Sequence, residues 1–132
     1  MRRHVSIRVL GWRLFHFGRF VMIVEFVRFR HPKGWSREQV LAEARTTVTK
    51  WQANEKLIRK HYIIGDDDMA GAFYIWPSRE DAEQAHDAAW RDGVMKRSGA
   101  PPTITYFDLQ MIVDNADGSV REFAADQTQW KT

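Results

Sequence analysis

Residues 57–76 read LIRKHYIIGDDDMAGAFYIW, two apolar runs separated by a polar turn. The first run, Leu57 to Ile64, and the second, Met69 to Trp76, are rich in the aliphatic, β-branched and aromatic residues that favour strands. Gly65 to Asp68 supplies turn residues between them. The sequence therefore predicts a β-hairpin at the centre of the chain.

A strand and a helix are predicted before this hairpin. Residues 21–30 are rich in Val, Ile and Phe, and the strand they indicate stops at His31-Pro32-Lys33-Gly34. Ser36, with Gln39 three residues later, forms the capping box of a helix that we expect to continue to about Asn54.

A second helix and a fourth strand are predicted after the hairpin. Ser78 begins the helix, which weakens at Gly93 and ends near Gly99. Residues 103–113, dominated by Thr, Ile, Tyr, Phe and Val, indicate a strand. A turn at residues 114–118 then leads into a short polar tail at 119–132.

The order β-α-β-β-α-β is that of ferredoxin-like folds, so we expect an α+β domain over residues 22–118. Its four-stranded antiparallel sheet would have the strand order 4-1-3-2, with both helices on one face. Because the other face carries many large apolar side chains, a partner sheet is its expected cover, which predicts a homodimer.

Composition excludes several classes of function. The 132 residues contain no cysteine, which excludes disulfides, thiol nucleophiles and cysteine-ligated metals and fits a cytoplasmic protein. Residues 1–20 hold five of the 20 basic residues and none of the 17 acidic ones, so the rest carries 15 − 17 = −2. This charge, and the absence of a basic-aromatic RNA-binding pattern at Ala70 to Tyr74, argue against nucleic acid.

The basic segment, residues 1–21, is expected to lie outside the domain. It alternates arginine with apolar residues and has no apolar run long enough for a signal-peptide core or a membrane helix, so no membrane partner is expected. Since Met22 opens the strand-like sequence, we expect the native start at Met22 instead of Met1. A mitochondrial transit peptide is the alternative that the arginine content leaves open.

An acid and a lysine interrupt the apolar faces of the first two strands. Glu25 lies in the row Val21, Ile23, Glu25, Val27, Phe29, and Lys60 in the row Ile58, Lys60, Tyr62, Ile64. With the third strand between them they would be about 10 Å apart. If both face the helices, they flank a gap over Gly71 or Ala72 that fits a small aromatic ligand. The alternative is that either side chain points into the dimer contact or toward solvent.

His86 is the candidate base, because it adjoins the Ala82 to Ala89 face of the second helix and can point toward the sheet. The alternative is a boundary histidine without a catalytic role. Among the aromatic residues, Tyr62, Tyr74 and Trp90 are expected nearest to a flat ligand, together with Trp51. No metal site is expected, because Asp66 to Asp68 lacks the later ligands of a calcium loop.

Several short segments between Met22 and about Gly118 together match a known pattern. They are Met22 to Val24, Val27 to Arg30, Leu57 to Lys60 with Tyr62, Ala70 to Trp76, Trp90-Arg91 with Val94, Gly99 to Pro102, Tyr106 to Asp108, and Val113 to Asn115. In this combination the chain resembles the dimeric α+β barrel superfamily and, within it, the YdhR-like monooxygenase family. Each segment alone is only a strand or turn pattern.

The resemblance implies a homodimer whose protomers each hold a pocket between sheet and helices. It also implies a cofactor-independent monooxygenase that oxidises a small aromatic or polycyclic substrate with molecular oxygen, an oxidoreductase without flavin, metal or haem. Haem-degrading relatives use an Asn on the first strand, and residues 22–30 contain none.

On this interpretation two residues are catalytic, His86 and Tyr62, and five bind substrate: Glu25, Trp51, Lys60, Tyr74 and Trp90. A non-catalytic small-molecule-binding or stress-associated protein is the main alternative. A structural dimer with a closed core is a third.

Overall fold

The computed structural model describes residues 20–126, which divide into two compact units. One unit consists of residues 23–107, and the described part of the other consists of residues 20–22 and 108–126. Most of the basic N-terminal segment therefore lies outside the described residues.

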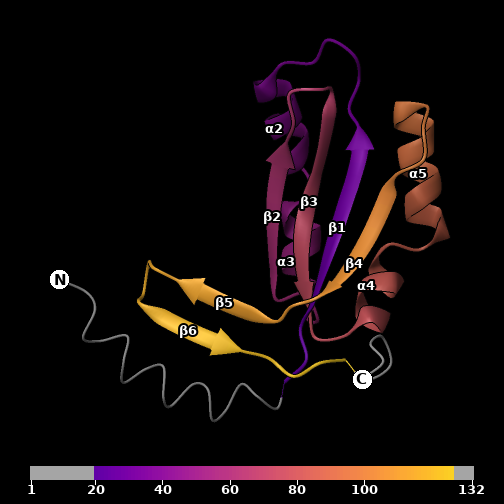
Figure 1. Cartoon of the computed structure of the whole chain (residues 1–132). Helices are drawn as coiled ribbons and strands as arrows, with labels where there is room; N and C mark the ends of the chain where they lie inside the picture. Colours follow the sequence, from indigo (N-terminus) through magenta and orange to yellow (C-terminus); the bar gives the residue numbers. More distant parts are fainter. Residues whose placement is uncertain (1–19, 127–132) are drawn as a thin grey trace. The chain divides into compact units, whose positions relative to one another are not determined.

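Four strands form an antiparallel sheet in the order β2-β3-β1-β4 (Figure 1). The strands are β1 (Ile23–Arg30), β2 (Arg59–Ile64), β3 (Met69–Trp76) and β4 (Thr103–Asp108). The hairpin of β2 and β3 and the strand order agree with the sequence prediction, so the α+β, ferredoxin-like fold class is confirmed.

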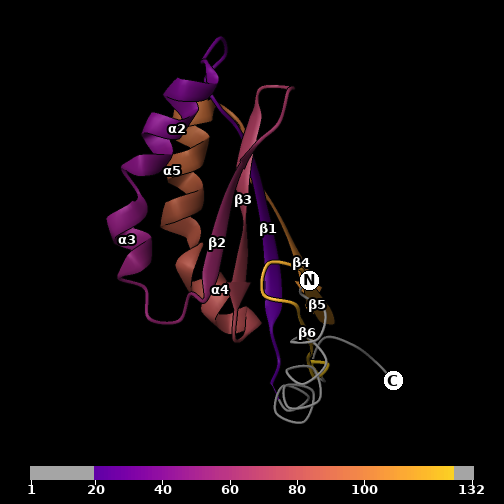
Figure 2. The ribbon, with the colours of Figure 1, turned by 90° about the vertical axis from the view of Figure 1, so that its left-hand side faces the viewer.

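The helices cover one face of this sheet (Figure 2). They are α2 (Arg37–Arg45), α3 (Val48–Gln52), α4 (Arg79–Ala85) and α5 (Ala88–Ser98). The capping box predicted at Ser36 is present, since the Ser36 hydroxyl accepts from the Gln39 backbone N–H and the Gln39 side chain accepts from that of Ser36.

The first predicted helix is broken, contrary to the expectation of one helix to Asn54. The break falls at Thr46 and Thr47, whose hydroxyls donate to the carbonyl oxygens of Glu43 (2.6 Å) and Ala44 (2.7 Å). Side chains that bond to backbone three residues earlier compete with the helical pattern. The break starts α3 at Val48, from which Trp51 packs into the core.

The second predicted helix is also broken, at His86 and Asp87. Asp87 is the N-cap of α5, and its carboxylate accepts from the Trp90 backbone N–H at 2.9 Å. The helix then continues through Gly93, where weakening was expected, and stops at Gly99 in the left-handed conformation (φ 78°). The break leaves His86 as the C-cap residue of α4, buried under the helix layer.

The predicted fourth strand, residues 103–113, is in fact two strands. After β4, the strand β5 (Met111–Asp114) pairs with β6 (Ser119–Glu122) in a separate two-stranded sheet. The turn predicted between them is present, and the Asp114 side chain accepts from the Ala116 N–H at 2.9 Å. The first part of the expected polar tail is therefore a strand, because that turn folds it back onto β5.

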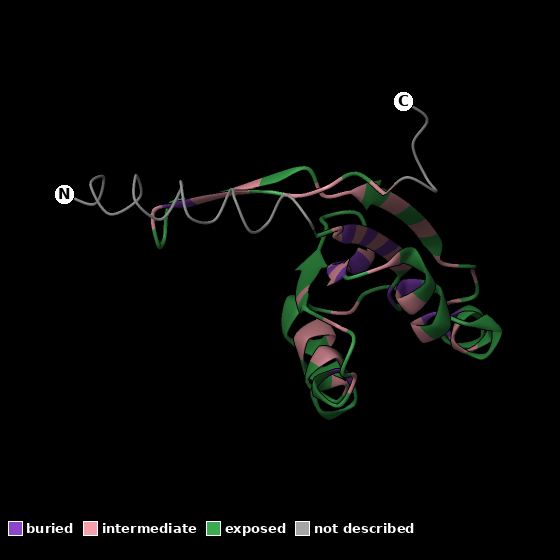
Figure 3. Cartoon of the chain, turned by 90° about the horizontal axis from the view of Figure 1, so that it is seen from below, coloured by how far each residue is buried: buried purple, intermediate pink, exposed green. Residues whose placement is uncertain are grey.

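The core of the 23–107 unit lies between the sheet and the helices (Figure 3). Alternate residues of β1 and β3 are buried there, as the period of a half-covered strand requires. Ile23, Val27, Trp76, Ala82 and Val94 are at most 1% exposed. Among the described residues, no helix has the length and apolarity needed to cross a membrane.

Candidate functional site

Strand pairing sets side chains in rows across the helix-covered face of the sheet. Glu25 of β1 pairs with Tyr74 of β3, and Tyr74 pairs in turn with Lys60 of β2. In the next row, Ala72 lies between Val27 and Tyr62. A small residue on the central strand, between larger neighbours, leaves space above the sheet.

A partly open cavity of about 560 Å³ occupies this space. Its floor includes Ala70, Gly71 and Ala72 of β3, and its sides come from α2, α3, α5 and β2. The volume lies in the range of small-molecule binding sites. The cavity lies over the two residues, Gly71 and Ala72, at which the sequence placed a gap.

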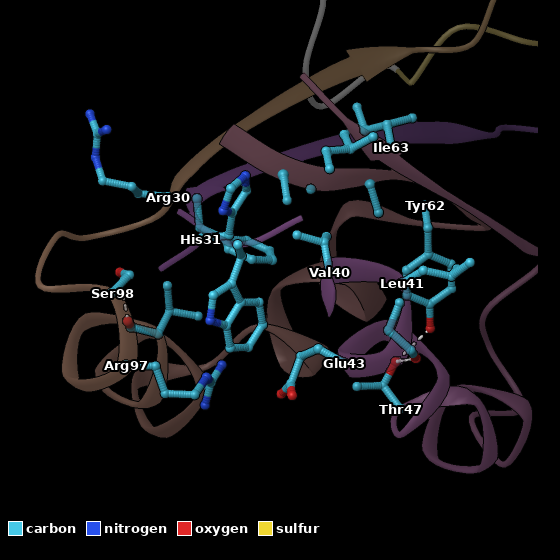
Figure 4. A pocket seen from close by; sticks show the side chains of 18 of the residues that line it. Arg30, His31, Val40, Leu41, Glu43, Thr47, Tyr62, Ile63, Arg97 and Ser98 are labelled. Carbon is cyan, nitrogen blue, oxygen red and sulfur yellow. Dashed lines mark hydrogen bonds between the residues drawn. The ribbon is translucent and has the colours of Figure 1, made fainter. Parts of the chain in front are cut away.

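The two ends of the cavity differ in character (Figure 4). At one end the hydroxyls of Tyr62 and Thr47 are hydrogen-bonded at 2.6 Å. At the other lie Arg97 and Ser98 of α5, with Val40 and Leu41 of α2 lining the space between. A ligand would therefore meet hydroxyl groups at one end and a guanidinium at the other.

Charges along the lining are mostly positive. The cavity is lined by five Lys and Arg side chains and one carboxylate, that of Glu43; the cations are Arg30, Arg37, Lys50, Lys60 and Arg97. Cations grouped around a concave surface attract an anion to it. The lining therefore favours a ligand with negative charge.

Beneath the cavity wall, Glu25, His86 and Trp76 form a buried hydrogen-bonded group. The Glu25 carboxylate accepts from the Trp76 indole N–H at 2.9 Å and lies 2.9 Å from His86 Nδ1. Glu25 and His86 are 0% and 1% exposed. With Nδ1 facing the carboxylate, His86 Nε2 is left as a buried ring nitrogen without a hydrogen-bond partner among the described residues.

Aromatic rings separate His86 from the cavity. The ring centroid of His86 lies 4.4 Å from that of Trp90, 4.7 Å from that of Tyr74 and 5.4 Å from that of Trp51. These three aromatic residues line the cavity, whereas His86 and Glu25 do not. The histidine is therefore one layer behind the surface that a ligand would touch.

Lys60 lies at the cavity surface inside a cage of three aromatic rings. Its Nζ atom is 3.9 Å from the ring centroid of Tyr62, 4.5 Å from that of Trp51 and 4.7 Å from that of Tyr74. No carboxylate among the described residues forms an ion pair with it. The Lys50 ammonium lies 4.8 Å from the same Trp51 ring, so two cations share one aromatic residue.

Burial and the charge of Lys50 lower the pKa of Lys60 to about 7, and the negative charge of Glu25 opposes them. Ring faces attract an ammonium and offset part of this effect. Burial also raises the pKa of Tyr74, and the Glu25 charge adds to the rise, so the Tyr74 hydroxyl keeps its proton. The site thus holds an amine that titrates near neutrality beside a phenol that does not.

The lowered pKa of Lys60 predicts a pH-dependent stability. Between pH 7 and 10 the unfolded chain retains the Lys60 proton, whereas the folded chain has lost it, so the stability of the wild type rises with pH. Lys60→Met lacks this contribution. The difference in unfolding free energy, wild type minus Lys60→Met, should increase from pH 6 to pH 9 in urea titrations. A difference that is flat or falls with pH would contradict the assignment.

The structure brings the seven residues singled out from sequence into one region, in two layers. Tyr62, Trp51, Lys60, Tyr74 and Trp90 line the cavity, and Glu25 and His86 lie beneath it. Glu25 and Lys60 face the helix layer, with Tyr74 between them.

Three further residues of this region were not identified from sequence. Trp76 is the second partner of Glu25, Thr47 is the partner of Tyr62, and Lys50 is a second cation on Trp51. Trp76 could have been found, because antiparallel pairing of the first and third strands puts it on the same face as Glu25. The positions of Thr47 and Lys50 depend on the helix break, which the continuous helical pattern to Asn54 did not predict.

The same fold occurs in several solved structures. NE2512, a protein of unknown function from Nitrosomonas europaea, has a TM-score of 0.54 and 20% identity, over 68% of this chain and 90% of that one. Rv0793 from Mycobacterium tuberculosis has a TM-score of 0.53 and 15% identity, over 70% and 99%.

A third structure is that of a monooxygenase from the gene ActVA-Orf6 of Streptomyces coelicolor, in complex with the ligand nanaomycin D. Its TM-score is 0.52 and its identity 16%, over 68% of this chain and 88% of that one. At these identities the likeness shows a shared fold. No protein-family model matches the sequence, and no curated protein matches it significantly.

Proposed function

We propose that the chain binds a small, electron-rich aromatic substrate in the cavity above Ala72 and oxidises it with molecular oxygen, without a cofactor. The observation that carries this proposal is an aromatic-lined, cationic cavity with a buried histidine-carboxylate pair one aromatic layer beneath it. The S. coelicolor monooxygenase, which has the same fold, supports it as an analogy.

In the proposed reaction the substrate itself donates an electron to oxygen. The protein would orient the substrate, exclude water and help to remove a proton, because a phenolate or carbanion reacts with oxygen more readily than its protonated form. Positive charge around the cavity would stabilise that anion. The rings of Trp51, Tyr74 and Trp90 would stack on a flat substrate.

Two residues are proposed as catalytic. His86 would accept the substrate proton at Nε2 while Glu25 holds Nδ1, which requires the substrate to enter between the rings that cover His86. Tyr62, whose hydroxyl donates to Thr47, would accept a hydrogen bond from a substrate hydroxyl at the cavity surface.

Burial of His86 favours a second candidate function, small-molecule binding without turnover. His86 does not line the cavity, and it is 1% exposed. If the aromatic layer stays closed, the cavity can hold a ligand but cannot bring it to the base. A ligand-binding protein with a structural histidine would have this arrangement.

The proposed assembly is a homodimer formed through the sheet face away from the helices. On that face Phe26 and Phe73 stack with their ring centroids 4.5 Å apart, and Phe107 is 46% exposed. A second copy of the sheet would remove this apolar surface from water. Membership of the YdhR-like family and a cytoplasmic location are parts of the same proposal.

Oxygen consumption tests the proposed reaction. Purified, metal-depleted protein should consume oxygen above the protein-free rate with anthrones, hydroquinones or electron-rich phenols, and labelled oxygen should enter the product. His86→Gln should lower kcat by about a hundredfold or more. The matched control is His61→Gln, which changes an exposed histidine of β2 and should leave the rate unchanged.

The two candidate functions give different results in this experiment. Saturable quenching of tryptophan fluorescence by the same compounds, without oxygen uptake, would reject the oxidation and support ligand binding alone. Uptake that His86→Gln leaves intact would keep the oxidation and remove His86 from the mechanism.

A further inference from the structure

We propose that Lys60 is a covalent binding site for small anionic carbonyl compounds, which would form an imine with its amine at the surface of the cavity. The inference concerns the cavity described above but does not depend on the oxygen reaction. It rests on three features of Lys60: the contacts of its Nζ atom, its access to the cavity and the charges around it.

The position of the Lys60 amine matches the needs of a nucleophile. The side chain lines the cavity, and three ring faces at 3.9 to 4.7 Å from Nζ replace part of the water that a surface lysine would have. Because no carboxylate among the described residues pairs with it, no ion pair must break before the amine reacts. The rings also limit where the amine can lie.

The charges around Lys60 favour its neutral form. Lys50 of α3 repels a proton there, Glu25 of β1 attracts one, and burial disfavours the charge. Tyr74 and Tyr62 are the titratable groups whose rings contact it among the described residues. Desolvation together with a second cation nearby is a known way to activate a lysine for attack on a carbonyl. With the pKa lowered to about 7, a large share of the amine is unprotonated at neutral pH.

The proposed step is a condensation that needs no oxidant or reductant. The Nζ lone pair attacks the carbonyl carbon, and a proton moves from nitrogen to the former carbonyl oxygen to give a carbinolamine. The carbon–oxygen bond then breaks, one water molecule leaves, and the carbon–nitrogen double bond forms. The hydroxyl of Tyr62, whose ring contacts Lys60, is the group that would carry this proton. Water reverses the reaction and releases the ligand.

The lining defines the kind of carbonyl compound. A cavity of about 560 Å³ accepts a single-ring or two-ring compound. Trp51, Tyr74 and Trp90 offer surfaces for a flat body, and Arg30, Arg37 and Arg97 attract a carboxylate or phenolate. An aromatic aldehyde or ketone with an acidic group fits all of these features.

Reductive trapping tests the inference. The full chain is incubated at pH 7 with 4-carboxybenzaldehyde and cyanoborohydride, which reduces an imine to a stable secondary amine. We expect one carboxybenzyl group per chain, located at Lys60 by peptide mapping. Its formation should be at least about tenfold faster than at Lys56, an exposed lysine outside the cavity. Benzaldehyde, which lacks the acidic group, should react at Lys60 more slowly.

Variants and the distribution of the label provide the controls. Lys60→Arg, which keeps a positive charge, should abolish the fast labelling, and Lys56→Arg should leave it unchanged. Labelling spread over several lysines at similar rates, or equally fast labelling of Lys60→Arg, would overturn the proposal. Because mapping locates the label in the wild-type chain, the test stands even if Lys60→Arg folds poorly. Fast labelling of Lys60 by 4-carboxybenzaldehyde, together with no oxygen uptake when anthrones, hydroquinones or phenols are added, would support this site and reject the proposed oxidation.

Discussion

Glu25→Ala is expected to reduce the free energy of unfolding by about 3–5 kcal/mol. The carboxylate is fully buried and is the hydrogen-bond partner of both His86 Nδ1 and the Trp76 indole N–H. Its removal leaves two buried nitrogen groups without an acceptor, and each such group costs about 1–3 kcal/mol. Urea unfolding of the variant and the wild type, compared at equal m-values, measures the loss.

The matched control is Glu38→Ala, which removes a carboxylate from an exposed ion pair with Arg45 (2.9 Å) and should cost at most about 0.5 kcal/mol. The pair Glu25→Ala and His86→Ala should also be non-additive. Once Glu25 is absent, truncating His86 removes a group that has already lost its partner. An effect of Glu25→Ala as small as that of Glu38→Ala would show that the buried group contributes little.

Gly71→Ala is expected to destabilise the protein by about 3 kcal/mol or more. A Cβ atom at Gly71 would lie 1.9 Å from the carbonyl oxygen of Val27 and 3.1 Å from Cα of Arg28. Both are backbone atoms of β1, so the clash can be relieved only if β1 and β3 move apart. This pairing carries Glu25, Tyr74 and the cavity floor, and ligand quenching of tryptophan fluorescence should weaken together with stability.

Gly93→Ala is a control that makes the same substitution elsewhere, and its effect on stability should be opposite in sign to that of Gly71→Ala. Gly93 lies inside α5, where an added Cβ meets only the end of the flexible Arg97 side chain at 3.2 Å. Alanine in a helix interior is more stable than glycine by about 0.5–1 kcal/mol. Thermal unfolding should therefore place Gly93→Ala at or above the wild type. If Gly71→Ala were equally stable, the close approach of the two strands would be wrong.

The sheet could be predicted from the sequence because its signals are local. Period-two apolar rows, the turn at residues 65–68 and the cap at Ser36 each act over a few residues. Together they predict the order of the elements along the chain, and the strand order follows because that order is typical of ferredoxin-like folds. The helix breaks were missed because Thr47 and Asp87 decide them through single hydrogen bonds within continuous helical patterns. The division of residues 103–113 was missed because their strand-forming composition is uninterrupted.

The site could be predicted only in part, for a related reason. The alternation of side chains between the two faces of a strand put Glu25 and Lys60 in apolar rows expected to face the helices, and the small residues of β3 indicated a gap. The depth of His86 below the cavity surface could not be inferred, because its position behind the aromatic layer follows from the helix break after α4. The three-ring contact of Lys60 depends on where α3 places Trp51, which no local pattern encodes.

The place of β2 at the end of the sheet has a consequence for self-association. An edge strand presents unpaired N–H and C=O groups on which a strand of another molecule can add, and Tyr62, Ile63 and Ile64 give β2 a composition suited to such addition. Arg59 is also on this strand and is exposed, so an added strand would have to bring its charge into the new contact. The exposed arginine of β2 thus opposes growth of the sheet by addition of further strands.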